Sequence, residues 1–574
     1  MSFFTTPKRA RCNVALITLF TLLGLPLTAA HGEEAWTVFH VATTGSDDHP
    51  GTAGEPFATL NRAFEKLETI QAPVRIAIEP GTYREGGLRI HRRDFPTLIE
   101  STGEQNVVIS GSDVWTDWTE RDGKLVAHWP YDWGNFNLDA GYPKRDHDAF
   151  RPAGQRSEMV FVDGQLLWQV MTAEEMEPGT FRVDLEANEL ILQLPEGKTA
   201  DALIEVGIRP NLLTTLSAVD LTLRGLTFQH AVSHPERDES FGAWGVSIFG
   251  EHVRGMTNAE SNPDRHFSER ITIEDCRFVF NNRVGLVFAN VKDIVIRDTN
   301  FDDNGVSGVT ANRVLRATLE DSTINRNNWR MGYLGHVIGW GPAGTKMLFM
   351  KDLTFTRCEV SDNYSTGLWL DTSVNYVTVK DSKMERNWGV GFYYEHNQGP
   401  ALLKDSLVRR NGYNDGTRTI RIGDGGVLYA ESEDLTIENC RIVENINFQI
   451  GSRDRDRPGI CYWTNRRNDG HCRNLVLKNS LVMGSYFDGK NAPEFYNASE
   501  HRINTLVGRQ AHAKEQMYID GFLATYQGSG NRFYNSVSSR VFSTGPNWGY
   551  DRVTIEDWQK LTGQDLDSAW APGQ

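Results

Sequence analysis

The chain has few cysteines and fewer basic than acidic residues. Its six cysteines in 574 residues follow no zinc-ligand spacing, which argues against a zinc site. Lysine and arginine total 59 against 75 aspartate and glutamate residues, so the formal net charge is −16. Nucleic-acid binding needs a basic surface that neutralises phosphates. We therefore expect no nucleic-acid partner.

Long hydrophobic runs are missing beyond the N-terminus. There, Lys8, Arg9 and Arg11 precede an apolar run over residues 14–27, followed by the small residues of "LTAAHG". This order is typical of a secretory signal peptide, which we assign to residues 1–32. The alternative, a membrane anchor, needs about 20 apolar residues, more than this run supplies. We expect a secreted or periplasmic protein, a monomer with no membrane contact after signal cleavage.

The composition that remains is that of a folded, turn-rich protein. Hydrophobic residues make up 39% and aromatic residues 10%, and there are 53 glycines. These values suit a mostly β protein with a packed interior. The length exceeds that of a single small core, so several domains or one repeat array are expected.

A short pattern recurs along the middle of the chain. In each copy a small residue precedes an apolar residue by two places and an asparagine by five. The copies are "DCRFVFN", "DTNFDDN", "DSTINRN", "RCEVSDN", "DSKMERN", "DSLVRRN" and "NCRIVEN". The asparagines are Asn281, Asn304, Asn327, Asn363, Asn387, Asn411 and Asn445, at intervals of 23, 23, 36, 24, 24 and 34 residues. The shorter intervals are one repeat, and the two longer ones contain an inserted loop.

This repeat predicts the fold. An alternating strand such as "ITIED" or "VTVKD" precedes each copy, and a glycine-led strand follows it. Three short strands per repeat, with turns between them and no long helical pattern, predict an all-β right-handed parallel β-helix solenoid. Asparagine suits a stacked turn because it tolerates left-handed backbone and its amide can bond to the asparagine of the neighbouring coil.

The small residues of the pattern form a second column. They are Cys276, Thr299, Ser322, Cys358, Ser382, Ser406 and Cys440. We therefore expect these three cysteines in the interior as small apolar groups. Cys461 and Cys472 flank "YWTNRRNDGH" and could form a disulfide, while Cys12 leaves with the signal peptide.

On these residues the chain resembles the pectate-lyase-like superfamily, the secreted right-handed β-helix proteins of carbohydrate metabolism. The opening "FHVATTGSDDHPGTAGEPFATLNRAFEKL", followed by "RIAIEPGTYRE", is similar to the usual entry of such enzymes, with a first strand, a capping helix and a first coil. Thr59 is the expected N-cap of that helix. The resemblance covers residues 219–230 and 271–480, and it implies a carbohydrate-active protein.

Two segments depart from the repeat. "EMVFVDGQLL" and "ELILQL" predict antiparallel strands in an inserted domain, and "VTIEDWQKLTGQDLDS" predicts a short helix that closes the far end. The expected regions are the signal peptide (1–32), the N-terminal cap and first coils (36–112), the inserted β-rich domain (113–215), the main β-helix with active-site loops (216–500), and the last coil with the C-terminal cap (501–574).

The segments "GLWLD" and "GFYYE" place Asp371 and Glu395 one repeat apart, 24 residues. Because side chains alternate along a strand, Trp369 and Asp371 should both point outward, as should Tyr393 and Glu395. Carboxylates on strands about 4.8 Å apart repel each other, which raises one pKa and leaves one acid and one base or nucleophile. Glycoside hydrolysis needs this division of roles, so both are predicted as catalytic.

The predicted substrate-binding residues surround this pair. The aromatic residues are expected to offer flat faces to sugar rings, and the two inserted loops supply further side chains. These residues are Asn312, His336, Trp340, Lys346, Trp369, Tyr393, His396, Arg418 and Arg421.

A basic cluster lies further along the chain. Its members are Arg453, Arg455, Arg457, Arg466 and Arg467. Arginine binds carboxylate or sulfate in a bidentate manner, which favours an anionic polysaccharide. The alternative is salt bridges with Asp454, Asp456 and Asp469.

Three functions follow. The first is a secreted glycoside hydrolase acting on a polysaccharide or oligosaccharide without a cofactor. The second, implied by the resemblance, is a polysaccharide lyase or epimerase, with Lys346, Arg418 or Arg421 as base and with Asp371 and Glu395 as calcium ligands. The third is a non-catalytic carbohydrate-binding β-helix.

Overall fold

The computed structural model describes most of the chain beyond the predicted signal peptide, which lies outside the described residues. The described ranges are 36–103, 107–133, 135, 151–233, 244–251, 267–335, 343–412, 425–454, 457–484, 505–510, 519–535, 538–544 and 552–571. Among the helices in these ranges, none has the length and apolarity needed to cross a membrane.

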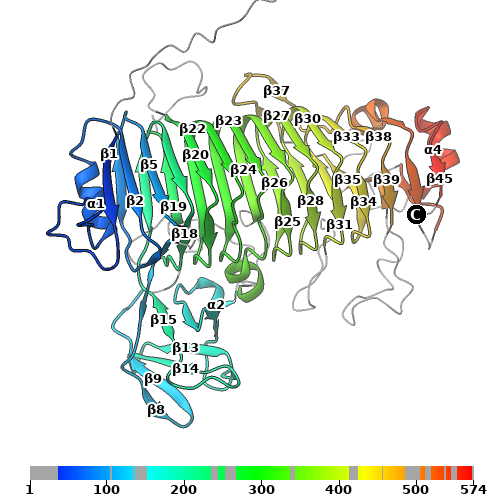
Figure 1. Ribbon diagram of the computed structural model, residues 1–574. Helices are drawn as coiled ribbons and strands as arrows, with labels where there is room; N and C mark the ends of the chain where they lie inside the picture. The colour runs from blue at the N-terminus through cyan, green and yellow to red at the C-terminus, as the bar shows by residue number, and fades with distance from the viewer. Residues whose placement is uncertain are drawn as a thin grey trace, which may run out of the picture. The chain divides into compact units, whose positions relative to one another are not determined.

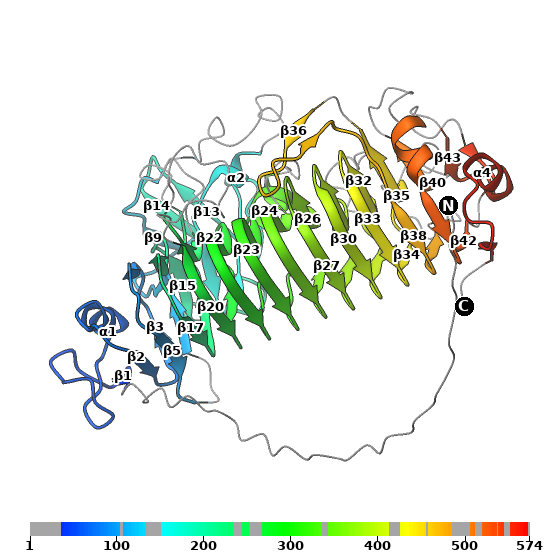
Figure 2. The same ribbon diagram turned by 90° about the horizontal axis from the view of Figure 1, so that it is seen from above.

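The central architecture is a right-handed parallel β-helix, as predicted, whose strands stack coil upon coil (Figures 1 and 2). β22 pairs in parallel with β23, with Val284 opposite Ser307, and β26 pairs with β29, with Leu368 opposite Phe392. These partners are 23 and 24 residues apart, so the repeat seen in the sequence is one coil.

One large stack of strands and two smaller stacks carry the solenoid. Strands of the larger stack are β1 (Thr37–Val41), β2 (Val74–Ile78), β4 (Leu88–His91), β5 (Thr97–Ser101), β16 (Leu213–Leu216), β17 (Leu221–Arg224), β19 (Trp244–Phe249), β20 (Ser268–Glu274), β22 (Val284–Arg297), β23 (Ser307–Glu320), β24 (Ala343–Thr356), β26 (Thr366–Asp371), β27 (Asn375–Lys380), β29 (Phe392–Glu395), β30 (Gln398–Lys404), β32 (Val427–Ala430), β33 (Glu433–Glu438), β35 (Phe448–Arg453), β38 (Val476–Lys478), β40 (Thr505–Gln510) and β41 (Gln527–Ser529). Those of the smaller stacks are β3 (Gly81–Tyr83), β6 (Val107–Ser110), β18 (Leu226–Gln229), β21 (Arg277–Val279), β25 (Glu359–Ser361), β28 (Lys383–Glu385), β31 (Leu407–Arg409), β34 (Arg441–Val443), β39 (Leu481–Met483), β42 (Arg532–Tyr534) and β45 (Ala569–Trp570).

A corner divides the larger stack into the first and second strand of each coil. In the long strands β22, β23 and β24, it falls at Asn290, Arg313 and Phe349, which have positive φ angles of 55°, 57° and 51°. In later coils the strands separate there, as β26 and β27 do around Thr372 and Ser373. This corner matters because the predicted catalytic residues end the first strands beside it.

The interior is filled by side chains stacked in register. Phe228, Phe278 and Phe301 form a continuous ring stack with centroid spacings of 5.3 and 5.1 Å. Burying such a side chain contributes roughly 2 kcal/mol. The cysteines at positions 276, 358 and 440 are buried and free, as predicted, and burial raises the pKa of each thiol to about 12.

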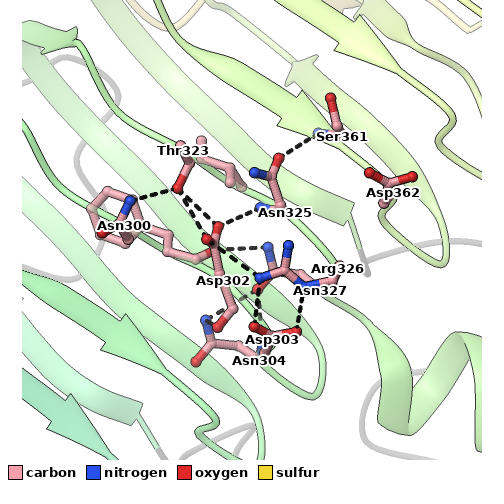
Figure 3. A network of polar contacts seen from close by, with 12 residues as sticks. Asn300, Asp302, Asp303, Asn304, Thr323, Asn325, Arg326, Asn327, Ser361 and Asp362 are labelled. Atoms are coloured by element: carbon pink, nitrogen blue, oxygen red, sulfur yellow. Dashed lines mark hydrogen bonds and ion pairs between the residues drawn. The ribbon is translucent and has the colours of Figure 1, made fainter.

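The asparagine column is the second stabilising feature, and it confirms the predicted stacked turn (Figure 3). The amide nitrogen of Asn304 donates to Oδ1 of Asn327 at 3.0 Å and to the backbone oxygen of Phe278 at 2.9 Å. Asn327 repeats both bonds with Asn363 and Phe301, at 3.0 and 2.8 Å. Each buried amide thereby satisfies backbone groups that the turn leaves without a strand partner.

Helices cover both ends of the solenoid (Figure 1). The helix α1 (Leu60–Leu67) begins at Thr59, whose hydroxyl accepts from the backbone N–H of Arg62, as predicted for an N-cap. At the other end, η5 (Ile519–Leu523) lies between β40 and β41, and the predicted helix α4 (Ile555–Thr562) lies between β44 (Arg552–Val553) and β45. Trp558 of α4 is fully buried and stacks on Phe542 of β43 (Phe542–Ser543), which pairs with β44.

The inserted segment forms two sheets outside the solenoid (Figure 1), and all of their strand pairs are antiparallel except the parallel pair β12–β13. Its elements are β7 (Ser112–Val114), β8 (Thr119–Arg121), β9 (Lys124–His128), α2 (Pro152–Gln155), β10 (Val160–Val162), β11 (Gln165–Leu166), β12 (Trp168–Gln169), β13 (Thr180–Asp184), β14 (Glu189–Gln193) and β15 (Ile204–Gly207). The chain rejoins the solenoid at β16, which pairs in parallel with β4 and β19. The first inserted loop of the solenoid begins with the helix η4 (Trp329–Leu334). Trp329 of this helix packs into the hydrophobic core of the inserted segment.

Candidate active site

The two predicted catalytic carboxylates lie side by side at the ends of β26 and β29. Asp371 is the register partner of Glu395, and Trp369 is the partner of Tyr393. Leu368 and the other alternate residues line the solenoid interior, so the predicted outward direction of the four site residues is correct. The carboxylate residues are nevertheless mostly covered, with exposed fractions of 9% for Asp371 and 5% for Glu395.

Asp371 lies beside a cation. Nζ of Lys346, on β24 of the preceding coil, is 3.0 Å from Oδ2 of Asp371. The hydroxyl of Thr372 donates to Oδ1 of the same carboxylate at 2.8 Å. These contacts suit a base or a nucleophile.

Glu395 has a different environment. Its Oε2 accepts from the indole N–H of Trp369 at 3.1 Å, and its Oε1 accepts from Arg453 and Arg457 at 2.9 and 3.1 Å. Burial and then the charge of Asp371 raise the pKa of Glu395 to about 7, although Arg457 and Lys346 lower it. A carboxyl group with a pKa near neutrality suits a general acid that later acts as a base.

The aromatic pair does not form the sugar platform expected from the sequence. The ring of Trp369 stacks on Tyr393 at 4.9 Å, and Nζ of Lys346 lies 3.6 Å from the ring centroid of Trp369. Because β24 and β29 flank β26 on opposite sides, these two neighbours cover both faces of the indole. Arg453 also donates to the hydroxyl of Tyr393 and lies over its ring. The pair orients the charged groups of the site.

A segment of a later coil, residues 457–471, crosses the corner beside the carboxylates, and we call it the strap. It contains β36 (Gly459–Ile460) and β37 (Arg467–Asn468), which lie along one edge of the solenoid strands (Figures 1 and 2). The backbone N–H of Tyr462 donates to the hydroxyl of Ser373 at 3.0 Å. The backbone oxygen of Arg457 is 3.1 Å from Nε2 of His396, whose pKa is lowered by burial and by the Arg457 charge.

Other predicted residues have mixed outcomes. Asn312 occupies the same register row two coils from Asp371 and accepts a hydrogen bond from Arg313. His396 lies under the strap, as described above. The remaining predicted substrate-binding residues, His336, Trp340, Arg418 and Arg421, lie outside the described residues.

The proposed disulfide is wrong. Cys461 and Cys472 are both buried and free. The thiol of Cys461 contacts Oδ1 of Asn375 at 3.3 Å, whereas that of Cys472 contacts the backbone oxygen of Tyr429 at 3.2 Å. The two cysteines therefore pack against different parts of the solenoid instead of closing the strap.

The basic cluster has glutamate partners, which neither sequence interpretation anticipated. Arg453 and Arg457 contact Glu395, and Arg466 contacts Glu433. Of the aspartates expected as partners, Asp469 pairs with Arg473 and Asp454 accepts from the backbone of Cys472. Arg455 and Asp456 lie outside the described residues.

Sequence reasoning missed one charged residue of the site, Glu431. It follows Ala430, the register partner of Glu395, and it is fully buried. Asp371, Glu395 and Ala430 are register partners on neighbouring coils, and we call this series of positions the carboxylate row. The only sign of Glu431 in the sequence is an acidic residue one place after this row. Within the described ranges, no group of three or more histidine, cysteine, aspartate or glutamate side chains is arranged to hold a metal ion. The expectation of no cofactor, with calcium as the alternative, stays a prediction.

Comparison with known proteins shows the fold. The family model described as "Right handed beta helix region" matches residues 262–442. Among solved structures, XylC in complex with xylose superposes with a TM-score of 0.61 at 13% identity, covering 87% of this chain and 84% of that one. A protein titled "Glycoside hydrolase" gives 0.44 at 10% identity, covering 92% and 99%. The A-module of the mannuronan C-5 epimerase AlgE6 of Azotobacter vinelandii gives 0.45 at 11%, covering 90% and 95%.

No curated protein matches the sequence of this chain. The family model and the superposition on XylC show that the chain is a right-handed parallel β-helix protein. Sequence identity at this level leaves the reaction to be argued from the site itself.

Proposed function

We propose that this protein is a glycoside hydrolase in which Glu395 is the general acid and Asp371 is the nucleophile or base. The observation that carries the proposal is the contrast between two adjacent carboxylates. Asp371 contacts an ammonium, while burial and the neighbouring charge hold the pKa of Glu395 near 7. Two adjacent carboxyl groups, one that can donate a proton and one that can act as a base or nucleophile, are what cleavage of a glycosidic bond requires.

The contacts assign a step to each group. Protonated Glu395 donates its proton to the glycosidic oxygen as the bond to the anomeric carbon breaks. Asp371 either attacks that carbon or removes a proton from the attacking water. The ionised Glu395 that results is stabilised by the guanidinium groups of Arg453 and Arg457, which already contact its Oε1. In a double-displacement reaction, this carboxylate then takes a proton from water.

We further propose an uncharged sugar as the substrate. Lys346 contacts Asp371, and both arginines contact Glu395. In the described part of the site, each of these cations is therefore already engaged by a protein carboxylate. A uronate or sulfate group would have to compete with those contacts, which disfavours the anionic substrates suggested by the arginine count.

The lyase alternative has less support. It requires Lys346, or an arginine outside the described residues, to abstract a carbon-bound proton. The ammonium of Lys346 is instead held between the Asp371 carboxylate and the Trp369 ring. The same geometry gives Asp371 and Glu395 cationic partners, which calcium ligands would not need.

The test is a substrate panel of neutral, uronate and sulfated glycosides, including xylosides because the XylC structure contains xylose. We expect new reducing ends without the ultraviolet absorbance of an unsaturated product. Unsaturated products would identify a lyase, and binding without cleavage would identify a carbohydrate-binding protein. The anomeric configuration of the first product then distinguishes a nucleophilic Asp371 (retention) from a basic one (inversion).

A further inference from the structure

Glu431 is a buried carboxylate held close to the proposed general acid. Its residue has an exposed fraction of 0%. Its backbone N–H donates to the oxygen of Arg453 at 2.9 Å, and its backbone oxygen accepts from Nδ2 of Asn468 on the strap at 2.7 Å. The solenoid and the strap together therefore fix its position.

Two arginines bridge Glu431 and Glu395. Nε of Arg457 donates to Oε2 of Glu431 at 2.7 Å, and its terminal nitrogen donates to Oε1 of Glu395 at 3.1 Å. Arg453 spans the same two residues, with its Nε 4.0 Å from Oε1 of Glu431 and its terminal nitrogen 2.9 Å from Oε1 of Glu395. The four side chains form one box of alternating charge.

The box has a consequence for the proton on Glu395. Two guanidinium groups beside a carboxyl group favour its ionised form, which cannot donate a proton. A second carboxylate within the same box draws the arginines toward itself and repels the charge of an ionised Glu395. Both effects are strengthened by the burial of the two glutamates and of most of Arg453, whereas the Arg457 side chain is 48% exposed and is screened more by water.

We propose that Glu431 is a positioning residue that favours the protonated form of Glu395 by balancing the charge of Arg453 and Arg457. The proposal rests on the glycoside hydrolase function proposed above. The other charged or titratable groups that face Glu395 in the described residues are Asp371, Lys346, Tyr393 and His396, and Glu431→Gln changes none of them.

The first test is the pH profile of Glu431→Gln, a variant that keeps the size of the side chain and an oxygen that can accept from Arg457. We expect the alkaline limb of kcat/KM to move to lower pH by about one unit or more. At neutral pH, hydrolysis of substrates with poor leaving groups should fall by about fivefold or more, because fewer molecules carry the acid proton. Dinitrophenyl glycosides, whose leaving group needs no proton, should lose much less. A purely structural role would lower both rates equally and leave the limb in place.

A matched control is Glu433→Gln. Glu433 is likewise a buried glutamate that pairs with an arginine of the strap, Arg466, and its second ionic partner is Arg473, so no arginine bridges it to Glu395 in the described residues. Its substitution should leave the limb unmoved. If Glu431→Gln folds poorly, the double variant Glu431→Gln/Arg457→Gln removes one charge of each sign. This double variant should return the limb toward the wild-type position, and failure to do so would contradict the charge-balance role.

A second readout does not depend on activity. Because the indole of Trp369 donates to Glu395, its fluorescence should follow the ionisation of that carboxyl group. The signal is obtained as a pH titration of each protein minus the same protein carrying Trp369→Phe. A lower midpoint in Glu431→Gln supports the inference even if no hydrolysis is found, in which case only the proposed function fails. An unchanged midpoint overturns the inference and leaves the proposed function standing.

Discussion

The asparagine column and the carboxylate row occupy the same coils but follow opposite rules. The column keeps one residue type through seven consecutive coils, and each amide makes the same bonds to the next. The row changes in nearly every coil, with Ala289, Asn312, Leu348, Asp371, Glu395 and Ala430 in succession. In a solenoid, a position that keeps the same residue in every coil stabilises the fold. A position whose residue changes from coil to coil can contribute to a single functional site.

The largest effect on activity is expected from substitutions of the two acids in the carboxylate row. Asp371→Asn and Glu395→Gln should each reduce kcat by about a hundredfold or more, because positioned proton transfer and nucleophilic attack contribute at least that much. Melting temperature and far-ultraviolet circular dichroism should stay close to wild type. Glu385→Gln, on β28 between the two strands that carry the carboxylates, is the matched control and should keep full activity. Full activity in both acid variants would refute the assignment.

The column should respond in the opposite way. Asn327→Ala removes an amide that bonds to Asn363 and to the backbone of Phe301, and it leaves buried polar groups unpaired. We expect a loss of about 1–3 kcal/mol in the free energy of unfolding. Denaturant titration measures it, while kcat per folded molecule should change little. A variant that lost activity but no stability would show that the column also takes part in the site.

The pH dependence sharpens the contrast between the two carboxylates. Glu395 must be protonated to act, and its pKa lies near 7, so kcat/KM should fall as pH rises through about 7. The loss should follow the titration of a single group. With dinitrophenyl glycosides, which need no acid, Glu395→Gln should retain measurable activity and lose this limb. A wild-type limb far above neutrality would contradict the assignment of Glu395 as the acid.

The smallest expected effect concerns Trp369. Trp369→Phe keeps a ring between Lys346 and Tyr393 but removes the N–H that donates to Glu395. Because both faces of the indole are covered, we expect a fall of a few-fold in kcat with little change in KM. Steady-state kinetics on a neutral glycoside separate the two parameters. A large rise in KM with unchanged kcat would restore the sugar-platform interpretation.

The sequence predicted the features that depend on the coil period. The solenoid, the stacked asparagines, the buried Cys276 and the outward direction of Asp371 and Glu395 all follow from residues recurring at intervals of 23 or 24. An outward side chain is different, because its contacts depend on whatever else reaches that surface. Arg457, which contacts Glu395, lies 62 residues later in the sequence. The repeat period does not predict such a contact.

The same argument explains the errors. The spacing of Cys461 and Cys472 allowed a disulfide, but each thiol packs on a separate partner in the solenoid. Trp369 looked like a binding surface because its exposure was inferred from alternation alone. In the structure, residues on adjacent coils cover it, and its exposed fraction is 6%.

The arginine bridge has a consequence for the order in which the protein matures. Arg453 and Arg457 follow Glu395 by 58 and 62 residues. A chain that is synthesised from its N-terminus contains both carboxylates before it contains these two cations. The coils up to Glu395 can stack without them, but the acid acquires its final electrostatic environment only when the later coil is added. Chains truncated before Arg453 would carry both carboxylates without these arginines, so competence for the reaction would appear late in biogenesis.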